Sequence, residues 1–377
     1  MKIENWGGWG HKSEWPAIPI RNREKVPIPS APEQSGPPVT INPLQHPEWD
    51  SLLAARPDST LFHSAAWARV LHETYGQRPA YIARFTSGQL ELLPIMEVCS
   101  PWTGRRGVSL PFTDVCPPLG AEGQDPRALY QLALEQGRQR HWRYLECRGG
   151  YYDLQGASPS LVYYGHVIEL EGGQEALFQR LDGAVRRAIR KAERRLAVEF
   201  SNSLESVRSF YALHCRTRRR HGLPPQPLSF FENIARHVLA RGHGFVVTVS
   251  FQGRSVAAGV FFHHGRQAIY KFGASDYAFQ HLRPNNLVMW EAIKSCAAKG
   301  FARLHLGRTS LSNEGLRRFK LGFGAQEERI AYYKYDFVER RFVTDVDRAE
   351  GWFKRVFRLM PPWLLGRAGQ ALYPHWS

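Results

Sequence analysis

The hydrophobic pattern of residues 244–337 predicts an α/β unit that opens with three strands. Three segments rich in β-branched and aromatic residues follow one another with short glycine-containing turns between them: 244–251, 255–262 and 268–275. A helix is expected from Pro284 to Gly300, because apolar residues recur there at helical spacing. Strands are expected at 302–307 and 329–337, with a short helix between them. The predicted order is β–β–β–α–β–α–β.

The first half of the chain repeats most of this order. Its predicted elements are strands at 79–85, 90–98 and 104–112, a helix at 126–140 and a strand at 142–149. Helical segments precede each unit, at 64–76 in the first half and at 204–222 and 228–242 in the second. The repeat predicts an internal duplication built on mixed α/β sheets.

The ends of the chain differ from this repeat, and they define the predicted domains. Residues 1–40 are rich in proline and glycine and are predicted to be a disordered arm. The two units are assigned to 41–165 and 166–340, and 341–377 is a basic amphipathic tail interrupted at Pro361–Pro362. Two interpretations of the tail stay open: it packs on the body, or it attaches to the inner leaflet of a membrane.

Composition narrows the classes of partner and the location. The net charge of +16 favours anionic partners. The 5 cysteines form no CxxC pair, which argues against a zinc site and a disulfide framework and favours a reduced, cytosolic location. No run approaches the roughly 18 apolar residues of a membrane span. We therefore predict a cytoplasmic protein with no metal site.

The stretch "TSLSNEGLRRFKLGFGA" (309–325) predicts a short helix with an unusual lysine. Leu316, Phe319 and Phe323 share its apolar face, Arg318 points away, and Lys320 falls on the border of that face. A partly desolvated ammonium in this position is suited to holding phosphate or stabilising an oxyanion. The alternative is a lysine whose stem covers apolar surface while its charge stays in water.

Five further candidates follow predicted strands or lie on them. Arg308 comes directly after the strand at 302–307, with a solvated loop arginine as the alternative. Tyr270 lies on a strand, and Ser275 and Asn285 follow it; a core tyrosine, a turn residue and a helix cap are the alternatives. Asp114, in "PFTDVCPPLG", binds or deprotonates an amine, or else forms a turn.

The segment "VRRAIRKAERRLAV" (185–198) predicts a helix with a dense cationic face. Arg186, Arg190 and Lys191 lie outside its apolar stripe, and Glu193 is the one acid in the segment. Contact with phosphate, lipid head groups or tRNA is one interpretation, and a solvated helix face is the other.

The predicted order of elements resembles the GNAT acyltransferase fold. A tandem pair of such units resembles the Fem-type (FemAB-like) aminoacyltransferases and the acetyltransferase-like relatives associated with exopolysaccharide and PEP-CTERM systems. The matching segments are "LFHSAAWARVLHETYG", "SLPFTDVCPPLG", "VRRAIRKAERR", "YKFGASD" with "LRPNNLVMWEAI", and "LGRTSLSNEGLRRFKLGFGA". The long helical arm of some Fem proteins is not expected here, and the R/Q-x-x-G-x-G/A phosphate loop of ordinary GNAT enzymes is not found in the sequence.

The resemblance implies an N-acyltransferase acting on an amine of a cell-envelope or exopolysaccharide precursor. Acyl-CoA or aminoacyl-tRNA would be the co-substrate, no cofactor would be tightly bound, and the amine would attack the donor directly. Lys320 aligns with the Fem family's FK–FG lysine and would stabilise the oxyanion, with help from Arg308. Asp114 and Tyr270 would place or deprotonate the amine.

Substrate binding is assigned to the remaining candidates. They are Ser275 and Asn285 together with Arg186, Arg190 and Lys191. The expected partners are a phosphorylated or lipid-linked envelope precursor, an anionic membrane surface and tRNA, but not DNA. A second hypothesis is a non-catalytic protein that recruits anionic glycolipid or nucleic acid through its basic surfaces. Thermal stabilisation by CoA thioesters or charged tRNA would separate the two.

Overall fold

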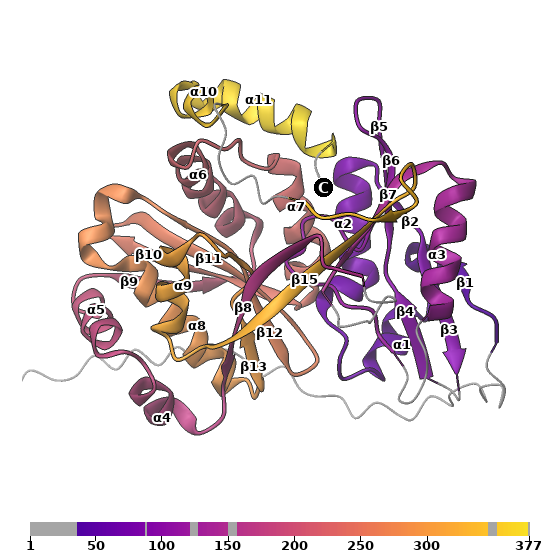
Figure 1. Cartoon of the computed structure of the whole chain (residues 1–377). Coiled ribbons are helices and arrows are strands. Elements are labelled where there is room, and N and C mark those ends of the chain that lie inside the picture. The colour runs from indigo at the N-terminus through magenta and orange to yellow at the C-terminus, as the bar shows by residue number, and fades with distance from the viewer. Residues whose placement is uncertain (1–35, 87–88, 121–126, 150–156, 346–352, 376–377) are drawn as a thin grey trace, which may run out of the picture.

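The computed structural model describes residues 36–86, 89–120, 127–149, 157–345 and 353–375 (Figure 1). The first 35 residues of the predicted arm therefore lie outside the described residues. The arm was extended too far at its other end, because Val39–Ile41 forms strand β1 and pairs with a later strand.

One mixed sheet runs through both halves of the chain. In spatial order, its strands are β2 (Arg78–Pro79), β5 (Met96–Ser100), β6 (Gly104–Val108), β7 (Trp142–Arg148), β15 (Gln326–Asp336), β8 (Leu161–Glu169), β13 (Arg303–His305), β12 (Gln267–Ser275), β11 (Arg254–His264), β10 (Gly244–Phe251) and β9 (Ala197–Ser201), with β14 (Thr309–Ser310) beside β8 and β16 (Arg341–Phe342) beside β15. The pairs β6–β7 and β12–β13 are parallel, and the other pairs are antiparallel.

The two parallel pairs mark the duplicated core. In each unit, a helix connects the two parallel strands: α3 (Arg127–Gln139) follows β6, and α8 (Pro284–Ala298) follows β12. The last strand of each unit then crosses to the other unit. β8, which follows β7, pairs with β13, while β15, which follows β13, pairs with β7. The predicted mixed α/β fold is confirmed, and the proposed boundary at 165/166 falls inside the exchanged strand β8.

A proline redirects the chain in the first unit. The sequence predicted one strand at 90–98, but the structure divides it into β4 (Gln89–Leu93) and β5, on either side of Pro94. β4 belongs to a separate three-stranded sheet with β1 and β3 (Tyr81–Thr86). Proline has no N–H for a sheet ladder and fixes φ, so pairing stops there and β5 enters the large sheet.

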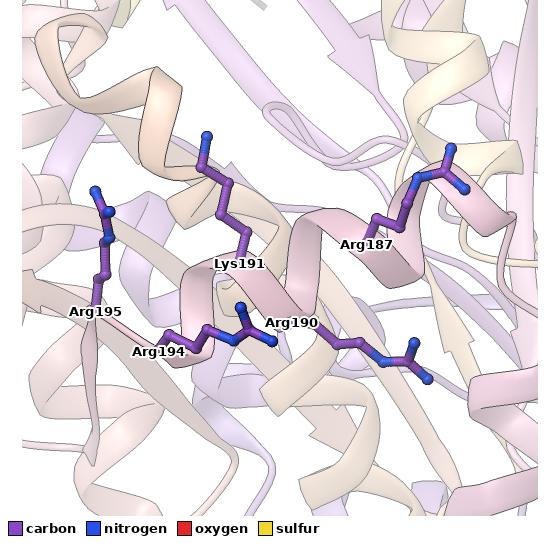
Figure 2. A pocket seen from close by; sticks show the side chains of 5 residues that line it. All are labelled: Arg187, Arg190, Lys191, Arg194 and Arg195. Atoms are coloured by element: carbon purple, nitrogen blue, oxygen red, sulfur yellow. The ribbon is translucent and has the colours of Figure 1, made fainter.

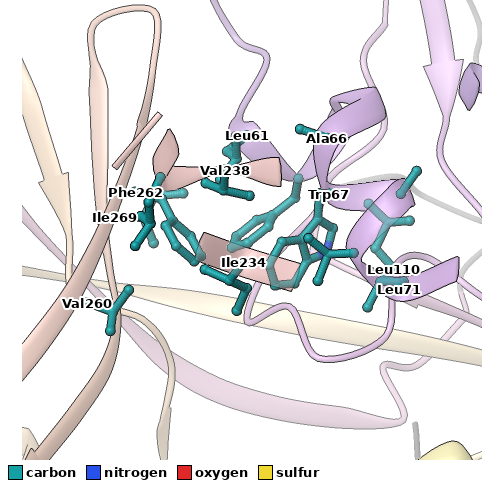
Figure 3. Packing of buried hydrophobic residues seen from close by; sticks show 14 of the residues in the cluster. Leu61, Ala66, Trp67, Leu71, Leu110, Ile234, Val238, Val260, Phe262 and Ile269 are labelled. Atoms are coloured by element: carbon teal, nitrogen blue, oxygen red, sulfur yellow. The ribbon is translucent and has the colours of Figure 1, made fainter. Parts of the chain in front are cut away.

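Helices cover both faces of the second unit's sheet. The other helices that precede the C-terminal segment are α1 (Trp49–Ala54), α2 (Ala65–Tyr75), α4 (Gly173–Gln179), α5 (Gly183–Glu193), α6 (Leu204–Arg220), α7 (Leu228–His237) and α9 (Glu314–Leu321). Strand β10 separates two cores, because Val246 packs with α2, α6 and α7 while Phe245 and Val247 pack with α5 and α8. Figure 3 shows Trp67 and Phe262 in the first of these cores, which joins the two units.

The C-terminal segment folds back over the body. α10 (Phe353–Leu359) and α11 (Pro362–Leu372) lie above α6 in Figure 1, separated at the predicted proline pair. A last 3₁₀ turn, η5 (Tyr373–His375), reaches the first unit, where the Arg106 guanidinium donates to the His375 carbonyl at 2.6 Å.

Two further observations concern the helices of the described ranges. The longest is α6, with 17 residues, so no long helical arm is present in these ranges. None of them combines the length and the hydrophobicity that crossing a membrane requires.

Candidate active site

A cavity of about 650 Å³ opens where the parallel strands β12 and β13 diverge. Their pairing ends at Ile269 and His305, and the residues just beyond, including Tyr270 and Arg308, line the cavity. The loop after β6 supplies Asp114 from the first unit, so both units build the site. Helix α6 and η5 form another part of the wall.

Lys320 is buried at the edge of this cavity, on α9. Its side chain amine donates to the backbone carbonyl oxygens of Gly307 at 2.8 Å and Arg308 at 3.1 Å. Only 3% of the residue is exposed, so it is buried more deeply than the border position predicted. Burial lowers its pKa to about 8, and repulsion from Lys271 contributes, although Asp114 acts in the opposite direction.

Local sequence explains why α9 holds Lys320 in place. The Asn313 side chain caps the helix by accepting from the Leu316 N–H, and Gly322 is the C-cap. The buried Phe323 anchors the end of the helix, whereas Arg318 is exposed, as predicted.

Asp114 forms an ion pair with Lys271 beside Lys320. The Lys271 ammonium lies 3.1 Å from the Asp114 carboxylate, and the Arg308 Nε lies 3.9 Å from it. Burial by itself raises the pKa of Asp114, but attraction to Lys271 and then to Arg308 is stronger in sum, so the pKa is lowered. Asp114 is therefore an ionised carboxylate, better suited to holding a cation than to accepting a proton.

Arg308 is fixed between two aromatic rings. Its guanidinium carbon lies 4.4 Å from the ring centre of Tyr163 and 5.3 Å from that of Tyr332. It donates to the Tyr332 hydroxyl at 2.9 Å, and that hydroxyl donates to the Asp114 backbone oxygen at 2.5 Å. This chain of contacts ties the loops of the two units together.

Glycine is required at position 307. Its φ of +72° lies in the left-handed region, and a Cβ there would be 2.9 Å from the Asp114 Oδ2. The close approach of the two loops therefore depends on the missing side chain.

Cations outnumber acids around the cavity. Arg148, at the end of β7, lines it from the first unit and pairs with Glu146 at 2.6 Å. Arg218 lines it from α6 and donates to the Tyr373 hydroxyl at 2.7 Å. Asp114 is the one carboxylate among the described residues that line the cavity, so the site favours an anionic substrate.

Tyr270 lines the cavity, whereas two other candidates do not. Burial raises the pKa of Tyr270 to about 12, so its hydroxyl is neutral near pH 7. Ser275 and Asn285 hydrogen-bond to each other at 3.2 Å and connect the end of β12 to the start of α8. Both lie outside the cavity lining, although the Ser275 backbone is hydrogen-bonded to the hydroxyl of Thr217, which does line the cavity. Their predicted role in binding stays a prediction.

The predicted cations of α5 lie on a separate surface. Arg190 and Lys191 line a pocket of about 310 Å³ on the outer side of the helix, shown in Figure 2 with the other lining residues, which are Arg187, Arg194 and Arg195. Arg186 instead donates to the Gln179 side chain at 2.7 Å. Within the described ranges, no carboxylate forms an ion pair with the lining residues of this pocket.

Several cavity residues were not predicted from the sequence. Lys271 is a charged residue in an apolar strand directly after Tyr270, and that break in the pattern was a usable indication. Arg148 is the last residue of β7 in the first unit, and Arg308 comes shortly after β13 in the second. Tyr332 had no such indication, because a tyrosine in a strand is ordinary.

Metal binding receives no support from the part of the chain that the structure describes. No group of three or more His, Cys, Asp or Glu side chains lies close enough together there to hold an ion.

Residues 180–335 match a family model described as acetyltransferase (GNAT) domain. The fold is similar to the crystal structure of FemX, with a TM-score of 0.64 and 14% identity over 80% of this chain and 98% of that one. It is also similar to a tandem GNAT protein from the clavulanic acid biosynthesis pathway (TM-score 0.50, 10% identity, 80% and 98% of the two chains). A third similar structure is the C-terminal domain of a putative lysylphosphatidylglycerol synthetase from Agrobacterium fabrum (TM-score 0.50, 13% identity, 79% and 92%).

No curated protein is similar enough in sequence to match this chain. The tandem GNAT-like fold inferred from the sequence is confirmed by these structures, and the GNAT acyltransferase class by the family model over residues 180–335.

Proposed function

We propose, from the N-acyltransferase domain of the GNAT type that residues 180–335 carry, that this protein transfers an acyl or aminoacyl group to an amine of a cell-envelope or exopolysaccharide precursor. The observation that carries the proposal is Lys320, a buried lysine with a pKa near 8 at the point where β12 and β13 diverge. Its neighbours Asp114 and Arg308 complete a cationic cavity with a single carboxylate among the described lining residues.

The reaction is direct attack of the amine on the donor carbonyl. The amine lone pair forms a C–N bond, and the carbonyl oxygen takes up negative charge. Two N–H groups of the Lys320 ammonium donate to the Gly307 and Arg308 carbonyls, and the third is available to this oxyanion. The C–S or C–O bond to the donor then breaks, its electron pair leaves with the departing thiolate or alkoxide, and this leaving group takes up the proton that the amine nitrogen loses.

Asp114 and Tyr270 would place the amine. The lowered pKa of Asp114 makes it a weak base, but an ionised carboxylate held by Lys271 attracts an incoming ammonium group. Tyr270 offers a neutral hydroxyl that donates or accepts a hydrogen bond. We therefore assign both residues to orientation of the acceptor.

A coenzyme A thioester is the first donor we propose, because the matched domain is an acetyltransferase domain. Aminoacyl-tRNA is the second, because the chain shares the fold of FemX. The cations Arg148 and Arg218 favour an acceptor that carries phosphate, as a nucleotide-linked or lipid-linked precursor does.

The test is product formation with both classes of donor. Purified protein is incubated with acyl-CoA in one arm and aminoacyl-tRNA in another, each with amino-sugar and peptide amines, and the mixture is analysed by mass spectrometry. In one of the two arms, we expect an N-acyl product whose mass exceeds that of the acceptor amine by the mass of the transferred acyl group. Thermal stabilisation by phosphorylated ligands without any product in either arm would instead support the non-catalytic binding hypothesis.

We further propose that the cationic face of α5 holds phosphates of the donor or acceptor. The helix N-terminus touches the end of α9, since the Asp182 N–H donates to the Gly322 carbonyl at 2.9 Å. This contact joins the start of α5 to the end of the helix that carries Lys320. The lining cations have no acidic partner in the described structure, which leaves them available to phosphate.

Removing two of these cations tests this role. We expect the double variant Arg190→Gln/Lys191→Gln to raise KM for the phosphate-bearing substrate about tenfold with kcat unchanged, because each exposed contact contributes about 0.5–1 kcal/mol. The matched control, Arg241→Gln/Arg266→Gln, removes two exposed cations elsewhere and should leave KM unchanged. If the α5 double variant and the control double variant have the same KM, the cations of α5 are solvated and do not bind the substrate.

A further inference from the structure

The C-terminal helices expose apolar side chains that most folded proteins would bury. Leu359 is 83% exposed, Val356 46% and Leu364 38%, so three large apolar residues protrude within nine positions of the chain. Several large apolar side chains that protrude within so short a segment are typical of a contact site. We call these residues, with the cations described next, the tail surface.

Within residues 353–375, which carry these apolar side chains, every charged side chain is positive. The cations of residues 353–375 are Lys354, Arg355, Arg358 and Arg367, and the same segment contains no Asp or Glu. Arg355 and Arg358 are exposed on the same helix as Leu359. Arg219 of α6 is also exposed, and it lies beside these cations, because its guanidinium donates to the Arg358 carbonyl at 3.3 Å.

An exposed tryptophan extends this surface into the first unit. Trp102, at the tip of the β5–β6 hairpin, is 67% exposed, and its ring lies 4.2 Å from that of His375 at the end of the tail. In Figure 1, the tip of this hairpin and the two tail helices lie on the same side of the molecule. Tryptophan is favoured where water meets lipid head groups, because its ring is apolar and its N–H is polar.

The tail surface is connected to the cavity through one residue. Tyr373 is buried, lines the cavity and accepts a hydrogen bond from Arg218 at 2.7 Å. Its own hydroxyl donates to the Pro224 carbonyl at 3.2 Å. The segment that carries Leu359 at one end therefore forms part of the cavity wall at the other.

We propose that the tail surface docks on an anionic phospholipid bilayer and presents the cavity to an acceptor carried by a lipid. Protruding leucine, valine and tryptophan side chains enter the head-group region, while Arg355 and Arg358 attract the lipid phosphates. The docking is inferred from the tail surface alone. The lipid-borne acceptor also rests on the proposed function.

Vesicle binding tests the docking without any turnover. Protein is sedimented with vesicles of phosphatidylcholine alone or mixed with phosphatidylglycerol, and bound protein is measured as salt rises. We expect binding to the anionic vesicles only, with release at high salt because exposed charges are screened. Arg355→Gln/Arg358→Gln should lower the partition coefficient about tenfold or more. Leu359→Ser should lower it about tenfold or more, since serine has no apolar side chain to transfer from water to the head-group region.

Matched variants distinguish the tail surface from general surface properties. Leu204→Ser removes a leucine that is 42% exposed at the far end of α6, and Arg241→Gln/Arg266→Gln removes two cations elsewhere. Both should bind vesicles like the unaltered protein. Equal binding to neutral vesicles, or equal losses in the controls, would overturn the proposal. So would a dimer in solution that Leu359→Ser converts to a monomer, because a second copy would then be the occupant.

The docking and the proposed chemistry fail separately. Lys320→Met should lose turnover and still bind anionic vesicles, because Lys320 lies in the cavity and not on the tail surface. In the Arg355→Gln/Arg358→Gln variant, turnover on a soluble amine should be retained, while turnover on an amine carried by an anionic vesicle should fall. Unimpaired turnover on the vesicle-borne amine by this variant would reject the lipid-borne acceptor alone. Failure of the unaltered protein to bind anionic vesicles would reject the docking itself.

Discussion

Replacing Lys320 by methionine is expected to lower turnover about 10²–10³-fold, the cost of removing one oxyanion donor. The methionine stem fills a similar volume, but it offers no N–H to the oxyanion or to the carbonyls of Gly307 and Arg308. The measurement is kcat with the donor that gives product, beside a thermal melt. Retention of full activity by the methionine variant would mean that the lysine only fills space.

The pH profile separates loss of the ammonium from loss of the fold. With a pKa near 8, Lys320 loses its charge as pH rises through 8, so turnover should fall on the alkaline side. Its contribution to stability runs the other way. The unfolded chain binds this proton more tightly, so stability should rise between about pH 8 and the ordinary lysine pKa of 10.5. Turnover that rises through pH 8 would make the neutral amine a base instead.

Arg318 provides the control on the same helix. It is exposed, and its guanidinium donates only to the Glu314 carbonyl, at 3.4 Å, among the contacts found for it. Arg318→Ala should therefore leave kcat and the melting temperature nearly unchanged.

Local patterns in the sequence were sufficient to predict α9 and the position of Lys320 on it. Of the three residues on the predicted apolar face, Phe319 and Phe323 pack in the core of the second unit, whereas Leu316 is 36% exposed and lines the cavity. Helical spacing therefore identified the inner face only in part. The depth of burial was not predictable, because the cover over Lys320 comes from distant segments such as the loop that carries Gly307 and Arg308. A periodicity describes one helix, whereas burial depends on what packs against it.

The element order of both units was predictable as well, because local patterns in the sequence identify single helices and strands. The exchange of β8 and β15 between the units was not predictable. Alternation along a strand indicates that it is a strand and which residues share a face, and nothing in it selects the neighbouring strand. The exchange brings Tyr332 of β15 into contact with the loop of the first unit that holds Asp114. The contact that joins the two units through Tyr332 therefore could not be predicted from the sequence, whereas Lys271 and Arg148 carried an indication there that was not used.

Replacing Asp114 by asparagine is expected to destabilise the fold and also lower turnover. The Lys271 ammonium, only 5% exposed, would lose its counter-charge at 3.1 Å, and breaking such a buried pair costs about 3–5 kcal/mol. Asparagine keeps the size of the side chain, and the backbone bond from Tyr332 to Asp114 does not depend on the carboxylate. The pKa values of Lys271 and Lys320 should fall further, because Asp114 raises both.

A second substitution separates the structural effect from the chemical one. In Asp114→Asn/Lys271→Met, the unpaired buried charge is gone, so most of the lost stability should return, as measured by urea unfolding. Turnover should stay low, because the carboxylate that orients the amine is still missing. If turnover returns together with stability, Asp114 serves only to neutralise Lys271, and the acceptor must be oriented by other residues of the cavity.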